Sequence, residues 1–228
     1  GLENFRYVLE LPGAIQVLWN TLWISFLKIV FNLAVPLTVS ILLNEVRKEV
    51  FKRGVQTLIY MPHFLSWVIL GGVLIDILST NHGLVNDFLG IFGIQPIYFL
   101  GDNNWFRTVL VSTDVWKEFG FNTVVYIAAL TGINPALYEA AVVDGANRWK
   151  QTLHVTLPGI APIIILLSVL SLGNVLNAGF DQVFNLYSPQ VYESGDIIDT
   201  FVYRIGLLEA QYGVATAVGL FKSIVSLI

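Results

Sequence analysis

The chain has 228 residues, of which 55% are hydrophobic and 12% are charged, and its mean hydropathy is +0.71. Soluble domains carry about 25% charged residues, so this composition excludes an ordinary soluble domain and predicts an all-α integral membrane protein. The net charge of −4 and the lack of a dense basic run argue against nucleic-acid binding. The absence of cysteine excludes disulfides and thiolate metal sites.

The first part of the chain predicts a lead-in followed by a membrane span. Residues 1–16 mix charged with aromatic and aliphatic side chains, which indicates an amphipathic segment. Residues 17–43 are apolar, and at about 1.5 Å per residue they can cross a hydrocarbon core of about 30 Å. Pro36 cannot donate to the carbonyl of Asn32, so we expect a kink there. The start lacks a signal-peptide pattern and the end lies in an apolar run, so we expect a sequence cut at both ends.

Four more apolar runs follow, and with the first they predict one membrane domain over residues 17–228 with at least five spans. The second run contains Pro62 and the pair Gly71-Gly72, which permits close helix contact. After it, residues 84–94 are too few to cross a membrane and predict a short interfacial helix. The further spans are predicted at about residues 56–79, 106–132, 159–180 and 210–228, the last of them truncated.

Basic residues are distributed unequally between the two sides of this predicted domain. The loop after the first span and the loop at 134–158 lie on one side, and together they hold six basic residues. The other side offers only Arg6, Arg204 and the boundary residue Arg107. Short loops rich in lysine and arginine face the cytoplasm, so the loop at 134–158 is predicted to be cytoplasmic. The six are Arg47, Lys48, Lys52, Arg53, Arg148 and Lys150.

Polar side chains recur at helical spacing within three of the predicted spans, where a charge costs about 3 kcal/mol on insertion scales. One interpretation is a shared polar cavity. The other is that these groups hold helices together, for example through an Asp114 to Lys117 pair one turn apart. In the first span Thr21, Ser25, Lys28 and Asn32 are predicted to form one helical stripe. In the fourth span Ser171, Asn174, Asn177 and Asp181 are predicted to form another. The candidate pathway residues are Asn32, Asp114, Trp116, Lys117, Asn122, Asn174, Asn177, Phe180 and Asp181.

The cytoplasmic loop at 134–158 predicts two short helices. Asn134-Pro135 is an N-cap followed by proline at the first helical position, and Asp144-Gly145 is a C-cap, so a helix is expected over residues 135–143. A second is expected from Asn147 to about His154. On the first helix small side chains lie at the centre of one face, which would let another protein approach closely. That face consists of Leu137, Ala140, Ala141 and Asp144.

The same loop carries a spaced motif: Glu139-Ala140-Ala141, three residues, Gly145, nine residues, an aliphatic residue, one residue, and Leu157-Pro158. The simplest interpretation is an ordinary helical hairpin in which alanine favours helix. The full spacing, however, resembles the signature loop of permease subunits from bacterial binding-protein-dependent ABC importers, with Val155 where isoleucine is commoner. The resemblance implies a coupling helix that docks on an ATPase subunit. The implied coupling residues are Leu137, Glu139, Ala140, Ala141, Asp144, Gly145, Leu157 and Pro158.

Three further segments resemble the oligosaccharide and polysaccharide group of these carbohydrate permeases, of which an alginate-type importer is one possible member. They are Met61–Trp67, Asp114–Gly120 and Gly173–Gln182. The resemblance implies a type I, MetI-like permease core in the bacterial cytoplasmic (inner) membrane. It also implies a second permease subunit of a different chain, two ATPase subunits that hold the ATP and Mg, an extracytoplasmic solute-binding protein, and no cofactor or metal in this chain.

Two other function classes are alternatives to the permease. A secondary transporter or channel would share the polar stripes, but such transporters typically show internal repeats, and none is evident. An intramembrane enzyme would need paired carboxylates such as Asp114 and Glu118, but no metal-ligand cluster or nucleophile motif accompanies them. The chain also lacks a phosphate-binding loop, so ATP hydrolysis is assigned to a partner and no catalytic residue is assigned here. Neither alternative explains the loop at 134–158.

Overall fold

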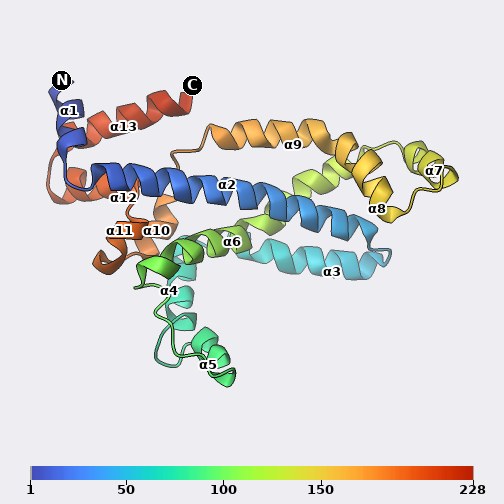
Figure 1. Cartoon of the computed structure of the whole chain (residues 1–228), viewed down its shortest axis with the longest axis horizontal. Helices are drawn as coiled ribbons and strands as arrows, with labels where there is room; N and C mark the ends of the chain where they lie inside the picture. Colours follow the sequence, from blue (N-terminus) through green and yellow to red (C-terminus); the bar gives the residue numbers. More distant parts are fainter. Residues whose placement is uncertain (1, 228) are drawn as a thin grey trace. The chain divides into compact units, whose positions relative to one another are not determined.

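The structure is a computed structural model that describes residues 2–227, and the regular structure of these residues is helical throughout. Gly1 of the predicted lead-in and Ile228 of the predicted fifth span lie outside the described residues. The first half contains α1 (Leu2–Glu10), α2 (Ala14–Glu45), α3 (Glu49–Tyr60), a 3-10 turn (Met61–Phe64), α4 (Trp67–Ile77), α5 (Leu84–Ile91) and α6 (Asn103–Thr131) (Figure 1). The second half contains α7 (Pro135–Val143), α8 (Arg148–Gln151), a π turn (Thr152–Thr156), α9 (Leu157–Leu172), α10 (Phe180–Leu186), a 3-10 turn (Pro189–Val191), α11 (Tyr192–Gly195), α12 (Ile198–Tyr203), a π turn (Arg204–Leu208) and α13 (Tyr212–Leu227).

The chain forms two compact units. Unit 1 comprises Gly1–Lys28, Leu65–Asp114 and Gly173–Ile228, and unit 2 comprises Ile29–Phe64 and Val115–Leu172. Helices α2 and α6 contribute residues to both. Unit 1 is built on two apolar clusters, one around Phe106 and Leu110 of α6 and one that joins α12 to α13; unit 2 has a smaller core around Tyr126 of α6.

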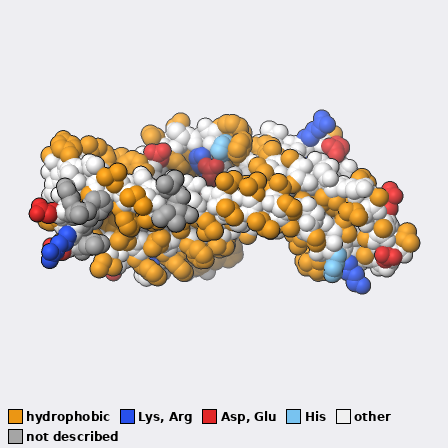
Figure 2. Space-filling model, turned by 90° about the horizontal axis from the view of Figure 1, so that it is seen from above, with side chains coloured by type: hydrophobic (Ala, Val, Ile, Leu, Met, Phe, Trp, Pro, Cys, Tyr) orange, Lys and Arg blue, Asp and Glu red, His pale blue; other side chains and the backbone are white. Residues whose placement is uncertain are grey.

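In α2 several polar side chains are buried while large apolar ones are exposed, which is the reverse of the pattern on a helix of a soluble protein. In the part of α2 within unit 1, Thr21, Ser25 and Lys28 are buried, whereas Trp19 and Phe26 are exposed. Apolar side chains dominate the surface seen in Figure 2, and charged ones are sparse there. Lipid tails are as apolar as these side chains, so this pattern is stable in a membrane. The polar stripe predicted in the first span therefore faces the protein interior.

Helices lie where the five spans are predicted, with different boundaries. Among the described residues, two helices are long and apolar enough to cross a membrane, Ala14–Glu45 and Arg148–Leu172, and up to four spans result if two broken helix pairs each count as one. The predicted second span is such a pair, because the chain breaks after Phe64 and α4 restarts where Ser66 accepts from the N–H of Ile69. The predicted fifth span coincides with α13. The number of crossings stays a prediction.

The predicted fourth span is wrong at its C-terminal end. We expected a helix over residues 159–180, but α9 ends at Leu172 and residues 173–179 are irregular. Asparagine side chains compete with helical hydrogen bonds and glycine weakens a helix, so this Gly- and Asn-rich segment resists continuation. Gly179, at φ +89°, then precedes α10.

The short helix predicted at 84–94 is present as α5, and an asparagine fixes its surroundings. Asn86 is buried, donates to the carbonyls of Ser79 and Ile97 at 2.9 and 3.0 Å, and accepts from the N–H of Ile97 at 2.8 Å. These bonds tie the chain before and after α5 to the helix itself. Its interfacial location stays a prediction.

Candidate functional sites

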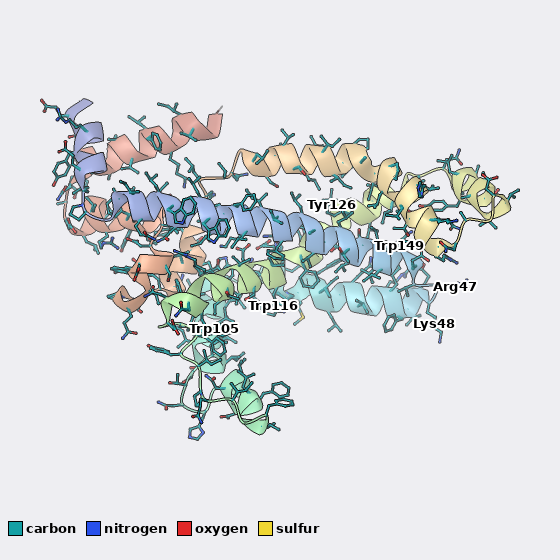
Figure 3. All side chains as sticks on the ribbon, viewed as in Figure 1. Arg47, Lys48, Trp105, Trp116, Tyr126 and Trp149 are labelled. Atoms are coloured by element: carbon teal, nitrogen blue, oxygen red, sulfur yellow. The ribbon has the colours of Figure 1, made fainter. Side chains whose placement is uncertain are left out.

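The basic loop residues gather at one end of unit 2. Arg47 and Lys48 lie at the turn between α2 and α3, and Trp149 lies on α8 (Figure 3). An ion pair of 2.6 Å between Arg148 and Glu45 joins α8 to the end of α2. The two loops that were counted together in the sequence therefore meet in space. This arrangement agrees with a common cytoplasmic side for both loops.

Helix α7 has the boundaries that the sequence predicts. Asn134 caps it by accepting from the N–H of Ala136 at 3.0 Å, and proline is its first residue. At its end Gly145 adopts φ +74°, donates to the carbonyl of Val142 at 3.0 Å, and is followed by Ala146, which donates to the carbonyl of Ala141 at 2.8 Å. These two bonds form a Schellman motif, in which a left-handed residue after the helix is almost always glycine.

The surface of α7 is largely uncovered by its own chain. The structure describes every residue of α7, and none of them is buried. Leu137 and Val142 are 52% and 61% exposed, and Ala140 is exposed as well. Ala141 is half-buried, and the hydroxyls of Tyr138 and Thr156 form a hydrogen bond of 3.0 Å. The side of α7 that carries Ala141 therefore partly faces the rest of the chain. The predicted small-residue face is thus only partly available, and Ala140 is its most accessible alanine.

A hollow of about 540 Å³ lies beside α7. Glu139 of α7 and the Arg148 to Glu45 ion pair line it, together with Tyr138 and Gln151. Glu139 is exposed at this hollow, so its carboxylate is available to a group from outside the chain. The hollow is therefore a recess that a side chain of another protein can enter.

The second predicted helix of the loop is longer than expected. We expected it to end near His154, but residues Arg148–Leu172 form one continuous helix with a π turn at Thr152–Thr156. Leu157 donates to the carbonyl of Thr152, five residues earlier, and Pro158 follows without an N–H of its own. The wider turn lets the helix pass the proline without a break. Leu157 and Pro158 therefore lie inside a continuous helix, at the start of α9, instead of ending a loop.

A buried lysine organises the polar interior of unit 1. Lys28 is 6% exposed and forms an ion pair with Asp114 of α6 at 3.1 Å. Its ammonium also donates to the carbonyl of Ala178 at 2.8 Å and to the side chain of Gln182. Gln182 is buried and donates to the carbonyl of Leu110 at 2.8 Å. Lys28 thereby connects α2, α6, α10 and the irregular segment 173–179.

The amides predicted to form a helical stripe lie on that irregular segment. Asn174 and Asn177 are both exposed, and the N–H of Asn177 donates to the carbonyl of Asn174 at 2.8 Å, which forms a turn. The predicted helical stripe is therefore wrong beyond Ser171, because the helix has ended. Asp181 lies in the first turn of α10 and is exposed. Both amides therefore lie on a turn, and Lys28 fixes the residue after that turn by donating to the carbonyl of Ala178.

A pocket of about 550 Å³ in unit 1 includes two of the predicted pathway residues, Asn177 and Phe180. Its other walls come from α12, the π turn after it and α13. Phe180 packs against Tyr203 with ring centroids 5.8 Å apart. The lining thus combines an amide, aromatic rings and, from α13, a hydroxyl at Thr216. These are groups that bind sugars through hydroxyls and through stacking.

The remaining predicted pathway residues belong to unit 2. Lys117 is 7% exposed and donates to the carbonyl of His63 at 2.9 Å and to Glu118 at 2.7 Å. His63 contacts Glu118 at 2.7 Å and stacks on Phe121 at 4.1 Å between ring centroids. This cluster fastens the 3-10 turn at Met61–Phe64 to α6. The other three, which are exposed or half-buried, are Trp116, Asn32 and Asn122.

Sequence reasoning missed several partners in these networks. Lys28 was noted only for its place on a stripe, and Gln182, His63 and the ion pair Lys222 to Asp199 were not singled out. A charged residue inside a predicted span was a usable signal for Lys222. For Gln182 and His63 no local pattern exists, since their partners are more than fifty residues away along the chain.

Aromatic and ionic contacts join the segment between α10 and α12 to Arg204, which follows α12. Burial raises the pKa of Tyr187 to about 12, and the neighbouring Tyr192 adds to the effect. Arg204 lies over the ring of Tyr192 at 4.6 Å and pairs with the buried Asp196 at 2.5 Å. The guanidinium of Arg204 is therefore used for structure.

Comparison with known proteins gives matches along the whole chain. A family model described as binding-protein-dependent transport system inner membrane component matches residues 32–180. The polygalacturonan/rhamnogalacturonan transport system permease protein YteP of Bacillus subtilis (strain 168) is 42% identical over 228 residues, which cover 100% of this chain and 71% of that protein.

Two solved structures give the same picture at the level of the backbone. One is the crystal structure of a bacterial ABC transporter involved in the import of the acidic polysaccharide alginate; one of its chains is 42% identical with a TM-score of 0.96, and the match covers 100% of this chain and 79% of that one. The same values hold for a bacterial alginate ABC transporter in complex with an alginate pentasaccharide-bound periplasmic protein. Sequence and backbone therefore agree on the kind of protein that this chain resembles.

Proposed function

The chain belongs to the family of binding-protein-dependent transport system inner membrane components, and on this premise we propose that it forms part of the path by which an acidic polysaccharide, or oligosaccharides derived from it, enters the cell. It is a multi-pass permease subunit of an ABC importer in the inner membrane and not itself an enzyme. The cargo assignment rests on its relatives, since YteP is named for polygalacturonan and the solved importer for alginate. Both polymers consist of acidic sugar units.

The structural feature that best supports the permease role is α7. It is a fully capped helix at the basic end of unit 2, and none of its described residues is buried. Large exposed apolar side chains such as Leu137 and Val142 favour a partner that covers α7, and the spacing of the loop motif supports an ATPase subunit as that partner. The proposal includes two ATPase subunits, a second permease subunit of a different chain and an extracytoplasmic solute-binding protein.

The proposed mechanism is alternating access. The binding protein delivers cargo to the outer face, the cargo passes the amides and rings around Asn177 and Phe180, and ATP-driven closure of the ATPases on α7 reverses the side to which the path opens. A secondary transporter or channel would have no use for an uncovered, capped helix in its cytoplasmic loop. Purification of the permease from native membranes, with identification of every associated chain, tests the proposal. Recovery of ATPase and second-permease chains is expected, and recovery of this chain alone would contradict it.

Replacing Asn177 with alanine is expected to lower cargo uptake about twofold to tenfold. The side chain is exposed at the pocket, so its loss should cost about one hydrogen bond to cargo and little stability. The measurement is uptake into proteoliposomes that contain the complete importer. Asn104→Ala, at an exposed amide of unit 1 outside the pocket lining, is the matched control and should transport normally. Equal uptake by wild type and Asn177→Ala would remove Asn177 from the pathway.

A further inference from the structure

A further ion pair of unit 1, between Lys222 and Asp199, lies in the wall of the pocket. The ammonium of Lys222 donates to both carboxylate oxygens of Asp199, at 2.6 and 2.8 Å. Lys222 lies on α13 ten residues after Tyr212, about 15 Å along the helix. It is therefore well inside the predicted fifth span. An ionisable residue at that depth is costly and usually serves a function.

The pair is accessible from the pocket. The side chains of Lys222 and Asp199 are 23% and 22% exposed, and both line the cavity of about 550 Å³. Among the described residues of the lining, these two are the charged ones. The rest of the lining offers rings at Phe180 and Tyr203, an amide at Asn177 and a hydroxyl at Thr216. The charges of Lys222 and Asp199 therefore cancel in the pocket lining, and the ammonium of Lys222 is the group there that suits an anion.

We propose that Lys222 is the group that recognises a carboxylate of the acidic cargo in this pocket, and that Asp199 stays bonded to the ammonium of Lys222 until the cargo arrives. This assignment rests on the proposed function. An ammonium has three N–H donors, and Asp199 uses two of them, so an incoming uronate can first bind to the third. The cargo carboxylate then replaces one or both bonds to Asp199.

The exchange explains why a lysine is tolerated inside a predicted span without cargo. An unpaired ammonium at this depth would be strongly destabilising, whereas a paired one is tolerated. Exchanging one carboxylate for another keeps the ammonium paired throughout. A neutral sugar cannot take part in this exchange, because its hydroxyls do not compensate the charge of Lys222 as a carboxylate does. Asp199 therefore acts as a competitor that only an acidic sugar displaces.

Three variants of the complete importer test this proposal: Lys222→Met, Asp199→Asn, and the double variant that carries both changes. The probes are a trimer of galacturonic acid and its methyl ester, which has the same rings without the negative charges. Uptake of each probe into proteoliposomes is compared between variant and wild type in the presence of the same binding protein, so that differences in delivery cancel.

Lys222→Met is expected to reduce uptake of the acid at least about tenfold relative to uptake of the ester, because a hydrogen bond to a charged group is lost. Asp199→Asn is expected to act in the opposite direction and raise the apparent affinity for the acid, since the competitor is neutral. The double variant removes both charges together, so it should assemble even if a single variant does not, and it should lose the preference for the acid.

Two results would overturn the proposal. If Lys222→Met and Asp199→Asn impair both probes equally, the pair only joins α12 to α13. If the double variant keeps the wild-type preference for the acid, recognition lies elsewhere. Failure of the proposed function has a different signature, because wild type itself would then take up neither probe or would favour the neutral ester.

Discussion

Replacing Ala140 with tryptophan should abolish cargo-stimulated ATP hydrolysis while the permease still folds and inserts. Ala140 is exposed on α7, and no residue of α7, all of which are described, is buried, so the new ring meets only solvent within this chain. In a complex the same ring would lie in the proposed interface, and interfaces packed to interior density have little room. The measurement is ATPase association during purification, together with cargo-stimulated hydrolysis in liposomes. Ala140→Ser is the matched control and should behave as wild type.

Gly145 provides an independent test of the same element. An added Cβ at Gly145 has no described neighbour within 4 Å, so a substitution there acts through the backbone alone. At φ +74° a β-branched residue is strained, whereas asparagine tolerates this region. Gly145→Val should therefore uncouple hydrolysis from transport, and Gly145→Asn should largely retain coupling. Normal association and stimulation in both Ala140→Trp and Gly145→Val would mean that α7 is not the coupling element.

Replacing Lys28 with methionine should strongly destabilise unit 1. The change removes the ammonium that lies 3.1 Å from the carboxylate of Asp114, a side chain that is only 16% exposed. It also removes the hydrogen bond from Lys28 to the carbonyl of Ala178. Removing one partner of a buried ion pair costs about 3–5 kcal/mol. The check is the thermal unfolding of the purified complex in detergent, where a large drop in midpoint is expected.

Two further variants separate charge from shape at this site. Lys28→Met combined with Asp114→Asn removes both charges and should recover most of the lost stability, because a neutral side chain tolerates burial better. Lys48→Met, at an exposed lysine outside the membrane, should unfold as wild type does. An unchanged unfolding midpoint in Lys28→Met would show that the network around Lys28 does not hold the segment 173–179.

Local signals explain how much of the molecule could be predicted from its sequence. The boundaries of α7 follow from Asn134, Pro135 and Gly145, each of which acts within a few residues of the helix end. The break in the second span could be anticipated from Pro62, but its position after Phe64 could not. The end of α9 was missed because apolar content continues past Leu172, while Gly173 and Asn174 end the helix locally.

The candidate sites were harder to predict because their partners are far apart in the sequence. Helical spacing suggested Lys117 as the partner of Asp114, whereas the structure provides Lys28 from another helix. Gln182 and Asp199 are ordinary polar residues in the sequence, and their importance depends on which helices pack together. The face of α7 was predicted from spacing alone, and the structure shows that its Ala141 side is partly covered by Tyr138 and its neighbours.

The most direct test of the account is uptake by the complete importer, reconstituted in liposomes with ATP inside and the binding protein outside. The account predicts that oligomers of an acidic sugar accumulate in the lumen, that accumulation requires ATP hydrolysis, and that Ala140→Trp abolishes it. Accumulation driven by an ion gradient without ATP, or ATP-driven uptake that ignores the acidic oligomers and favours neutral ones, would contradict it.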